Sequence, residues 1–181
     1  MREGKYPSII CISGKIASGK TYVSKQLVER NDWSRCSTSE YLRYLLGKQG
    51  VSNPTRERLQ EQGEEEMKRG WKAFAKSFIQ FALNNNPKDV LVVDGVRHIE
   101  FLEEVKHLIR PQKCLLIYLE SSDEIIKNRL NERGETDIDY SRRAEGNQCE
   151  LACLADYTSM GNIDNIESYV KEALCIKIAR A

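Results

Sequence analysis

The sequence predicts an α/β fold, a three-layer sandwich in which a parallel sheet of about five strands has helices on both faces. Two observations carry this prediction. Short apolar runs that are typical of buried strands alternate with segments of helical spacing, and a glycine-rich loop separates the first strand from the first helix. At 181 residues, without a repeat or a low-complexity linker, the chain is expected to form one domain, 1–181.

The strands are assigned from their apolar character. Val90–Val93 and Cys114–Leu119 are continuous apolar runs, as is typical of central strands in a parallel sheet. Ser8–Ser13 is a β-branched apolar run that leads into the glycine-rich loop. The predicted strands are 8–13, 33–38, 90–93, 114–119 and, with the weakest pattern, 155–160.

The helices are assigned from spacing and from capping residues. Ser37 and Ser121 each stand three residues before a glutamate, which predicts two capping boxes. Asn53 is expected to cap a helix that has Pro54 at its first position. The predicted helices are 22–30, 37–46, 55–69, 71–83, 99–108, 121–133, 140–154 and 165–174.

Two neighbouring helices differ in character. Helix 55–69 is highly charged, with Leu59 and Met67 as its only large apolar residues, so we expect most of its surface to be exposed. Helix 71–83 carries an apolar, largely aromatic stripe, which we interpret as core packing.

The glycine-rich loop fits the phosphate-binding pattern G-x-x-x-x-G-K-S/T at every fixed position. Its glycines let backbone N–H groups surround an anion, and the helix that follows adds its positive dipole end. We expect Lys20 to reach the β- and γ-phosphates and Thr21 to bind Mg²⁺ through its hydroxyl. A chance glycine turn is disfavoured by the strand before the loop and the helix after it. The predicted nucleotide-binding residues are Gly14, Ile16, Ala17, Ser18, Gly19, Lys20 and Thr21.

A second candidate site residue, Asp94, follows the strand Val90–Val93. Ligands bind at the C-terminal ends of strands in doubly wound sheets, and a carboxylate there can hold Mg²⁺ directly or through water. The alternative is an aspartate that caps the next helix. With the glycine-rich loop upstream, the functional interpretation is favoured, and the two motifs together predict ATP and Mg²⁺ as cofactors.

The charge balance disfavours nucleic acid as a partner, without excluding it, and gives no support for a membrane. Lys+Arg 28 against Asp+Glu 27 gives a net charge of +1, which offers no global electrostatic support for binding nucleic acid or a membrane surface. The sequence has no apolar run long enough to span a bilayer and no signal-peptide core before the first strand. We therefore expect a cytoplasmic protein, as a monomer or a homodimer.

The six cysteines give no disulfide or metal pattern. Three of them lie in apolar segments, where a thiol packs as a small hydrophobic group. Cys149 and Cys153 are four residues apart, but the further ligands of a zinc site are missing. His98 and His107 are expected to be solvated helix residues.

Several segments resemble one family. Asp94-Gly95-Val96-Arg97 is similar to the Asp-Gly-x-x-Arg stretch of P-loop nucleoside monophosphate kinases, and 39–43 resembles the segment after their second strand, whose arginine contacts the acceptor phosphate. Residues 54–63 resemble viral deoxynucleoside monophosphate kinases and archaeal nucleotide-kinase-like proteins. Residues 155–157 and the last helix resemble the C-terminal end of the same group, which includes dephospho-coenzyme A kinase. The resemblance spans most of the chain, and the phosphate loop is its most specific part.

The resemblance implies the P-loop NTPase fold, with an acceptor-binding insertion at about 38–83 and a lid at about 129–143. It further implies that Arg43 and Arg97 bind the acceptor phosphate, a task that suits the planar, doubly donating guanidinium group. For each of these arginines the alternative is a surface salt bridge.

The implied lid carries more arginines. Arg129 and Arg133 are four residues apart on one helix face and are predicted to be catalytic, together with Lys20 and Asp94, while Arg142 is predicted to bind substrate. Arginines that close over the transferring phosphoryl group would stabilise its charge, and closure would exclude water. The alternative is a solvated charged loop, because acidic residues dilute the positive charge.

The predicted activity is that of an ATP-dependent phosphotransferase, a kinase that transfers the γ-phosphoryl group to a (deoxy)nucleoside monophosphate. The segment 36–40 departs from the pattern, since it has neither the Asp pair of dephospho-coenzyme A kinases nor the Gly-Asp usual in nucleoside monophosphate kinases. The first departure counts against dephospho-coenzyme A kinase activity, and the acceptor pocket is unusual on either interpretation. A kinase acting on a hydroxyl, with Asp94 as base, stays open. Its acceptor would be a dephospho-coenzyme A-like molecule, a modified nucleotide or, against the neutral charge, a nucleic acid.

Three other classes have less support. A non-catalytic nucleotide sensor stays open, because the sequence alone cannot show turnover. A GTPase switch is disfavoured because no Asn-Lys-x-Asp box follows a late strand. A remodelling ATPase would normally need a larger domain.

Overall fold

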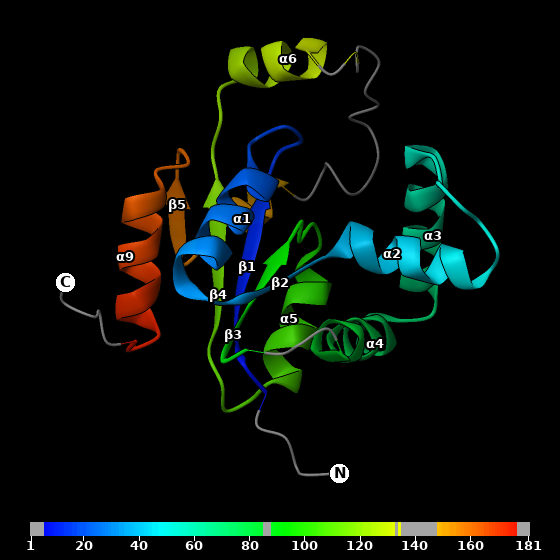
Figure 1. Ribbon diagram of the computed structural model, residues 1–181, viewed down its shortest axis with the longest axis horizontal. Coiled ribbons are helices and arrows are strands. Elements are labelled where there is room, and N and C mark those ends of the chain that lie inside the picture. The colour runs from blue at the N-terminus through cyan, green and yellow to red at the C-terminus, as the bar shows by residue number, and fades with distance from the viewer. Residues whose placement is uncertain (1–5, 85–87, 133, 135–147, 177–181) are drawn as a thin grey trace.

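The computed structural model of the protein describes residues 6–84, 88–132, 134 and 148–176. Its strands form one five-stranded parallel sheet in the order β2-β3-β1-β4-β5 (Figure 1). The strands are β1 (Ser8–Gly14), β2 (Ser34–Ser37), β3 (Val90–Asp94), β4 (Cys114–Leu119) and β5 (Tyr157–Ser159). The predicted α/β fold of the P-loop NTPase type is confirmed.

Helices cover both faces of this sheet. On one face α1 (Lys20–Asn31) and α9 (Ile163–Ala173) pack against the strands, and on the other lie α4 (Trp71–Asn84), α5 (Ile99–Leu108) and α8 (Gln148–Cys153). Figure 1 shows α2 (Thr38–Lys48) and α3 (Arg56–Lys68) beside the sheet, next to α4. The remaining helix, α6 (Asp123–Glu132), lies over the loop that follows β1.

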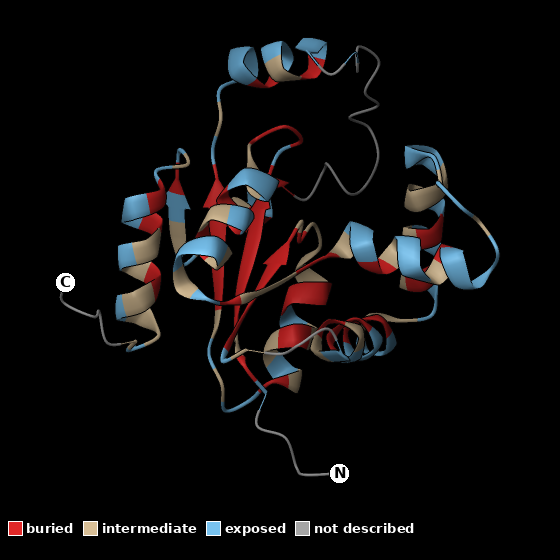
Figure 2. Cartoon of the chain, in the orientation of Figure 1, coloured by how far each residue is buried: buried red, intermediate tan, exposed pale blue. Residues whose placement is uncertain are grey.

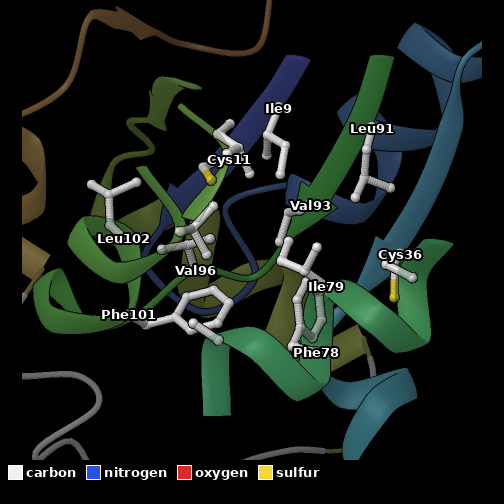
Figure 3. Packing of buried hydrophobic residues seen from close by; sticks show 14 of the residues in the cluster. Ile9, Cys11, Cys36, Phe78, Ile79, Leu91, Val93, Val96, Phe101 and Leu102 are labelled. Atoms are coloured by element: carbon white, nitrogen blue, oxygen red, sulfur yellow. The ribbon is translucent and has the colours of Figure 1, made fainter. Parts of the chain in front are cut away.

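Two hydrophobic clusters, one on each face, hold the layers together. Side chains alternate across a strand, so Ile10 of β1 points to α1 and α9 while Ile9 points to α4 and α5. Figure 2 shows that the central strands and the inner sides of the helices are buried. Figure 3 shows the cluster on the face covered by α4 and α5. In it, Phe78 of α4 and Phe101 of α5 pack edge to face, with ring centroids 5.4 Å apart. This core fixes the strand ends that carry the candidate site.

The capping box at the start of α2 forms as predicted. The Ser37 hydroxyl accepts a hydrogen bond from the Glu40 amide at 3.0 Å, and the Glu40 carboxylate accepts one from the Ser37 amide at 2.8 Å. Since β2 ends at Ser37, this pair sets where the strand turns into the helix.

Replacing Ser37 with alanine is expected to lower the free energy of unfolding by about 1 kcal/mol, because one amide of the first turn of α2 loses its partner. Urea denaturation measures this change. Ser52→Ala, at an exposed loop position, is the control and is expected to leave stability within about 0.5 kcal/mol of the original. Equal stability of the two variants would contradict the assigned role of the cap.

Two predicted caps are wrong by one or two residues. Thr55, in extended backbone, accepts a hydrogen bond from the Arg58 amide at 3.2 Å, whereas Asn53 lies two residues too early and adopts a left-handed conformation with φ of +54°. In α6 the cap is the hydroxyl of Ser122, which accepts from the Ile125 amide at 3.3 Å. The predicted cap, Ser121, instead donates to a carbonyl of the glycine-rich loop, and its hydroxyl is therefore not a helix cap.

Most of α3 is exposed or half-exposed, as predicted, but one side of the helix buries two polar residues. Gln62 and Glu66 are buried there and hydrogen bond to each other at 3.3 Å. Gln49, at the end of α2, donates to Gln62 at 3.2 Å, and Arg69 pairs with Glu66 at 2.8 Å. Charged and polar residues can be buried here because they satisfy one another, and the chain of contacts joins α2 to α3.

One predicted helix extends beyond the residues that the structure describes. Of the helix predicted over 140–154, only α8 lies in the part of the chain that the structure describes. Among the described helices, none combines the length and apolar character needed to cross a bilayer.

Candidate active site

The glycine-rich loop connects β1 to α1 at the C-terminal edge of the sheet. Gly14 has φ of +141°, and a Cβ atom at this position would lie 2.5 Å from the Leu119 carbonyl oxygen, so no other residue fits. Gly19 has φ of +99° and is the N-cap of α1. Because it has no side chain, Gly19 leaves the first amides of the helix uncovered, which suits an incoming anion.

The side chains of the loop fit a phosphate chain. The Ser18 hydroxyl is buried and has no hydrogen-bond partner among the described residues, although a buried hydroxyl normally has one. The Lys20 ammonium donates to the carbonyls of Gly14 and Lys15, each at 2.6 Å, and so lies across the loop. An anion in the loop would meet both an unsatisfied hydroxyl and a cation.

Asp94 lies next to the helix that carries Thr21. The Ser24 hydroxyl is 3.0 Å from the Thr21 carbonyl oxygen and 3.3 Å from Oδ2 of Asp94. Asp94 is 4% exposed, and it pairs in register with Ile12 of β1 and with Ser37, the last residue of β2. It does not cap the next helix, since the N-cap of α5 is His98.

Sequence reasoning missed Arg35, a residue of β2 that binds Asp94. Its guanidinium donates to Asp94 Oδ2 at 2.7 Å, to Glu40 Oε1 at 2.7 Å and to the Ser24 hydroxyl at 2.9 Å. Burial alone would lower the pKa of Arg35, but the bonds to Glu40 and Asp94 outweigh it and the pKa is raised. Burial would likewise raise the pKa of Glu40, but the bonds from Arg35 and the Ser37 amide lower it.

A cleft of about 880 Å³ opens between α2, α3, the start of α4 and the segment 95–101. Ile16 lines it, so the cleft reaches the glycine-rich loop. Arg43 and Arg97, the two arginines predicted to bind an acceptor phosphate, both line this cleft. Its other cationic residues are Arg56 and Lys68, and its aromatic residues are Trp71, Phe74, His98 and Phe101.

The two histidines differ. His107 is exposed on α5, as predicted for a solvated helix residue. The same prediction is wrong for His98. His98 is half-buried at the N-cap of α5, and its ring packs on Trp71 with centroids 4.9 Å apart. The partner comes from α4, which is why the local sequence of His98 gave no sign of this contact.

Helix α6 packs against the glycine-rich loop. Ile16 and Ala17 of the loop form a buried apolar cluster with Ile126 and Leu130 of α6. Arg129, one of the arginines predicted for the lid, donates to the Ala17 carbonyl at 2.9 Å and so lies against the loop. The other two lid arginines, Arg133 and Arg142, lie outside the described residues.

The cysteines that the structure describes are all free thiols. Cys11 and Cys114, on adjacent strands, have their sulfur atoms 3.8 Å apart within the core. Among the described residues, no group of three or more His, Cys, Asp or Glu side chains is placed to hold a metal ion.

Comparison with known proteins identifies the family. The family model AAA_18, described as an AAA domain, matches residues 10–152, which run from β1 to α8. The chain belongs to the AAA_18 family. No curated protein matches its sequence.

Solved structures of kinases share the fold of this AAA_18 chain. The shikimate kinase of Acinetobacter baumannii in complex with shikimate is 15% identical, with a TM-score of 0.57 over 96% of this chain and 97% of the other. The gluconokinase of Sinorhizobium meliloti 1021 is 14% identical, with a TM-score of 0.53 over 95% and 98%. The shikimate kinase of Bacteroides thetaiotaomicron is 15% identical, with a TM-score of 0.54 over 93% and 99%. At these identities the likeness shows the fold.

Proposed function

We propose that this chain is an ATP-dependent kinase that transfers the γ-phosphoryl group to the phosphate of a (deoxy)nucleoside monophosphate. One observation carries the proposal: the cleft that starts at the glycine-rich loop combines Arg43 and Arg97 with several aromatic side chains. Guanidinium groups suit an acceptor phosphate, and aromatic surfaces suit a base. The similar structures named as kinases support phosphoryl transfer on this fold.

The donor side fits ATP with Mg²⁺. The loop would hold the phosphates through its backbone amides, the buried Ser18 hydroxyl and the Lys20 ammonium. The Thr21 hydroxyl and the Asp94 carboxylate are the residues that would hold Mg²⁺, directly or through water. When bound, Mg²⁺ supplies charge neutralisation at the phosphate oxygens.

The remaining residues stabilise charge and exclude water. Lys20 and Arg129 lie at the glycine-rich loop, where negative charge develops during transfer, and fixed cations there lower the barrier. The apolar cluster between the loop and α6 keeps water from this side of the loop. An ionised acceptor phosphate needs no general base, which suits an Asp94 whose Oδ2 is already bound by Arg35 and Ser24.

A kinase that acts on the hydroxyl of a small acid is the second candidate, because the similar structures include two shikimate kinases and a gluconokinase. Asp94 would then have to accept the hydroxyl proton. Its Oδ2 already accepts hydrogen bonds from Arg35 at 2.7 Å and from Ser24 at 3.3 Å, and this occupancy weighs against the role.

A panel of acceptors separates the two candidates. Purified protein with ATP and Mg²⁺ would be offered ribo- and deoxynucleoside monophosphates, dephospho-coenzyme A, shikimate and gluconate, beside Lys20→Ala as the control. Turnover of a nucleoside monophosphate that the control lacks supports the proposal. Turnover of a hydroxyl acceptor alone would replace it with the second candidate, and ATP binding without transfer to any acceptor would leave a nucleotide sensor.

Arg43→Met is expected to raise the KM for the acceptor by roughly 10- to 100-fold, because one charge-assisted hydrogen bond to phosphate is lost. The KM for ATP should change less than about twofold, since Arg43 lies on the acceptor side. Lys76→Met, which removes an exposed cation on α4, is the matched control. An acceptor KM that rises equally in both variants would show that Arg43 has no specific role.

A further inference from the structure

Arg35, a residue of β2, contacts three other elements through one side chain. Its three donor nitrogens reach Ser24 of α1, Asp94 at the end of β3 and Glu40 in the first turn of α2. The Arg35 side chain is 16% exposed and that of Asp94 is 5% exposed, so solvent and salt screen their ion pair little. A single group therefore holds the ends of two neighbouring strands and the starts of two helices.

The three elements carry opposite sides of the candidate site. Helix α1 starts at Lys20 and carries Thr21 on the donor side, next to Asp94. Helix α2 carries Arg43, which lines the acceptor cleft. Glu40 also belongs to the capping box that sets where α2 begins. The bond from Arg35 to Glu40 therefore helps to fix the first turn of α2.

We propose that Arg35 is a positioning residue, which holds Asp94 in place and fixes the position of α2, the helix that carries Arg43, relative to the glycine-rich loop. The inference rests on the proposed function, whose donor and acceptor sides it connects. Small misplacements matter, because an error of about 1 Å between reacting groups can lower a rate by roughly 100-fold.

Only arginine suits this position. Its planar group donates in several directions at once, whereas a lysine ammonium is a single compact charge. A lysine in its place could pair with Asp94 but could not span Ser24, Asp94 and Glu40 together. Elsewhere, Arg30 of α1 also contacts two carboxylates, Asp164 and Glu167, but its side chain is 41% exposed, which makes it a matched control.

Four variants test the proposal: Arg35→Met, Arg35→Lys, Glu40→Gln and the control Arg30→Met. With the acceptor found in the panel, Arg35→Met is expected to lower kcat at least roughly tenfold and to raise the acceptor KM severalfold. Arg35→Lys and Glu40→Gln should raise the acceptor KM and largely keep kcat, because the charge beside Asp94 remains. Arg30→Met should change neither. The proposal would be overturned if the acceptor KM, and kcat calculated per folded molecule, stayed unchanged in all four variants.

Amide hydrogen exchange gives a readout that needs no turnover. In the protein without nucleotide, exchange of the Ser37 and Glu40 amides is expected to speed up severalfold in Arg35→Met and Glu40→Gln, and to stay unchanged in Arg30→Met. Unchanged exchange in the first two would also overturn the proposal. If the original protein phosphorylates no acceptor, the proposed function fails, and the exchange rates still decide whether Arg35 positions α2. If Arg35→Met does not fold, Arg35→Lys and Glu40→Gln carry the kinetic measurement, and Glu40→Gln carries the exchange measurement.

Discussion

Lys20→Ala is expected to lower kcat by at least about 100-fold, which is the usual cost of removing one fixed donor from a site where charge develops. The ammonium bonds to two carbonyls of the glycine-rich loop and therefore lies where phosphates would be held. Initial rates of ADP formation at saturating acceptor measure the effect. Thermal unfolding of the variant should stay close to that of the original, because Lys20 lies outside the two hydrophobic clusters of the sheet.

Lys25→Ala is the matched control for Lys20, since it removes an exposed cation from the same helix. Its kcat should stay within about twofold of the original. If Lys20→Ala kept the rate of this control, the glycine-rich loop would not be the site of phosphoryl transfer.

Asp94→Asn is expected to lower both activity and stability. The carboxylate is 4% exposed and pairs with Arg35 at 2.7 Å, so its neutralisation leaves the buried guanidinium with Glu40 as its remaining charged partner. Breaking a buried pair from one side costs about 3–5 kcal/mol in the free energy of unfolding, and the bond to Glu40 places the expected cost near the lower end of this range. We expect kcat to fall at least about tenfold as well, because a fixed charge is lost at the C-terminal edge of the sheet. Urea denaturation and initial rates measure the two effects.

The double variant Asp94→Asn/Arg35→Met separates these two effects. It removes both charges, so it should be clearly more stable than Asp94→Asn alone, while its activity stays low. Asp32→Asn is the surface control, because its pair with Lys88 is exposed and should contribute at most about 1 kcal/mol. Equal loss of stability in Asp94→Asn and Asp32→Asn would mean that the buried pair has no special role.

Local patterns predicted most of the fold. The strand Cys114–Leu119 and the helix Ile99–Leu108 have the predicted bounds, because continuous apolar runs and helical spacing are properties of short windows of sequence. The capping box of Ser37 and Glu40 also formed, since its two members are three residues apart. The caps at Asn53 and Ser121 were misplaced because several neighbouring residues could serve, and backbone conformation selects among them.

Contacts between distant segments could not be predicted in this way. Arg35 and Asp94 are 59 residues apart and meet only because β2 and β3 are neighbours in the sheet. His98 finds Trp71 on another helix. The burial of Gln62 could not be predicted for the same reason, since its side chain accepts a hydrogen bond from Gln49 at the end of α2. A polar residue in sequence gives no sign of the partner that allows it to be buried.

The most direct test of the account is the phosphorus NMR spectrum of the product that the protein makes from ATP and the acceptor that it uses. Transfer to a monophosphate creates a phosphoanhydride on the acceptor and leaves ADP from the donor. The account therefore predicts two nucleoside diphosphates, each with a pair of coupled doublets, for every ATP consumed, and Lys20→Ala should produce neither. A new uncoupled signal of a phosphate ester would show that the acceptor group is a hydroxyl. That result would contradict the role assigned to Arg43 and Arg97.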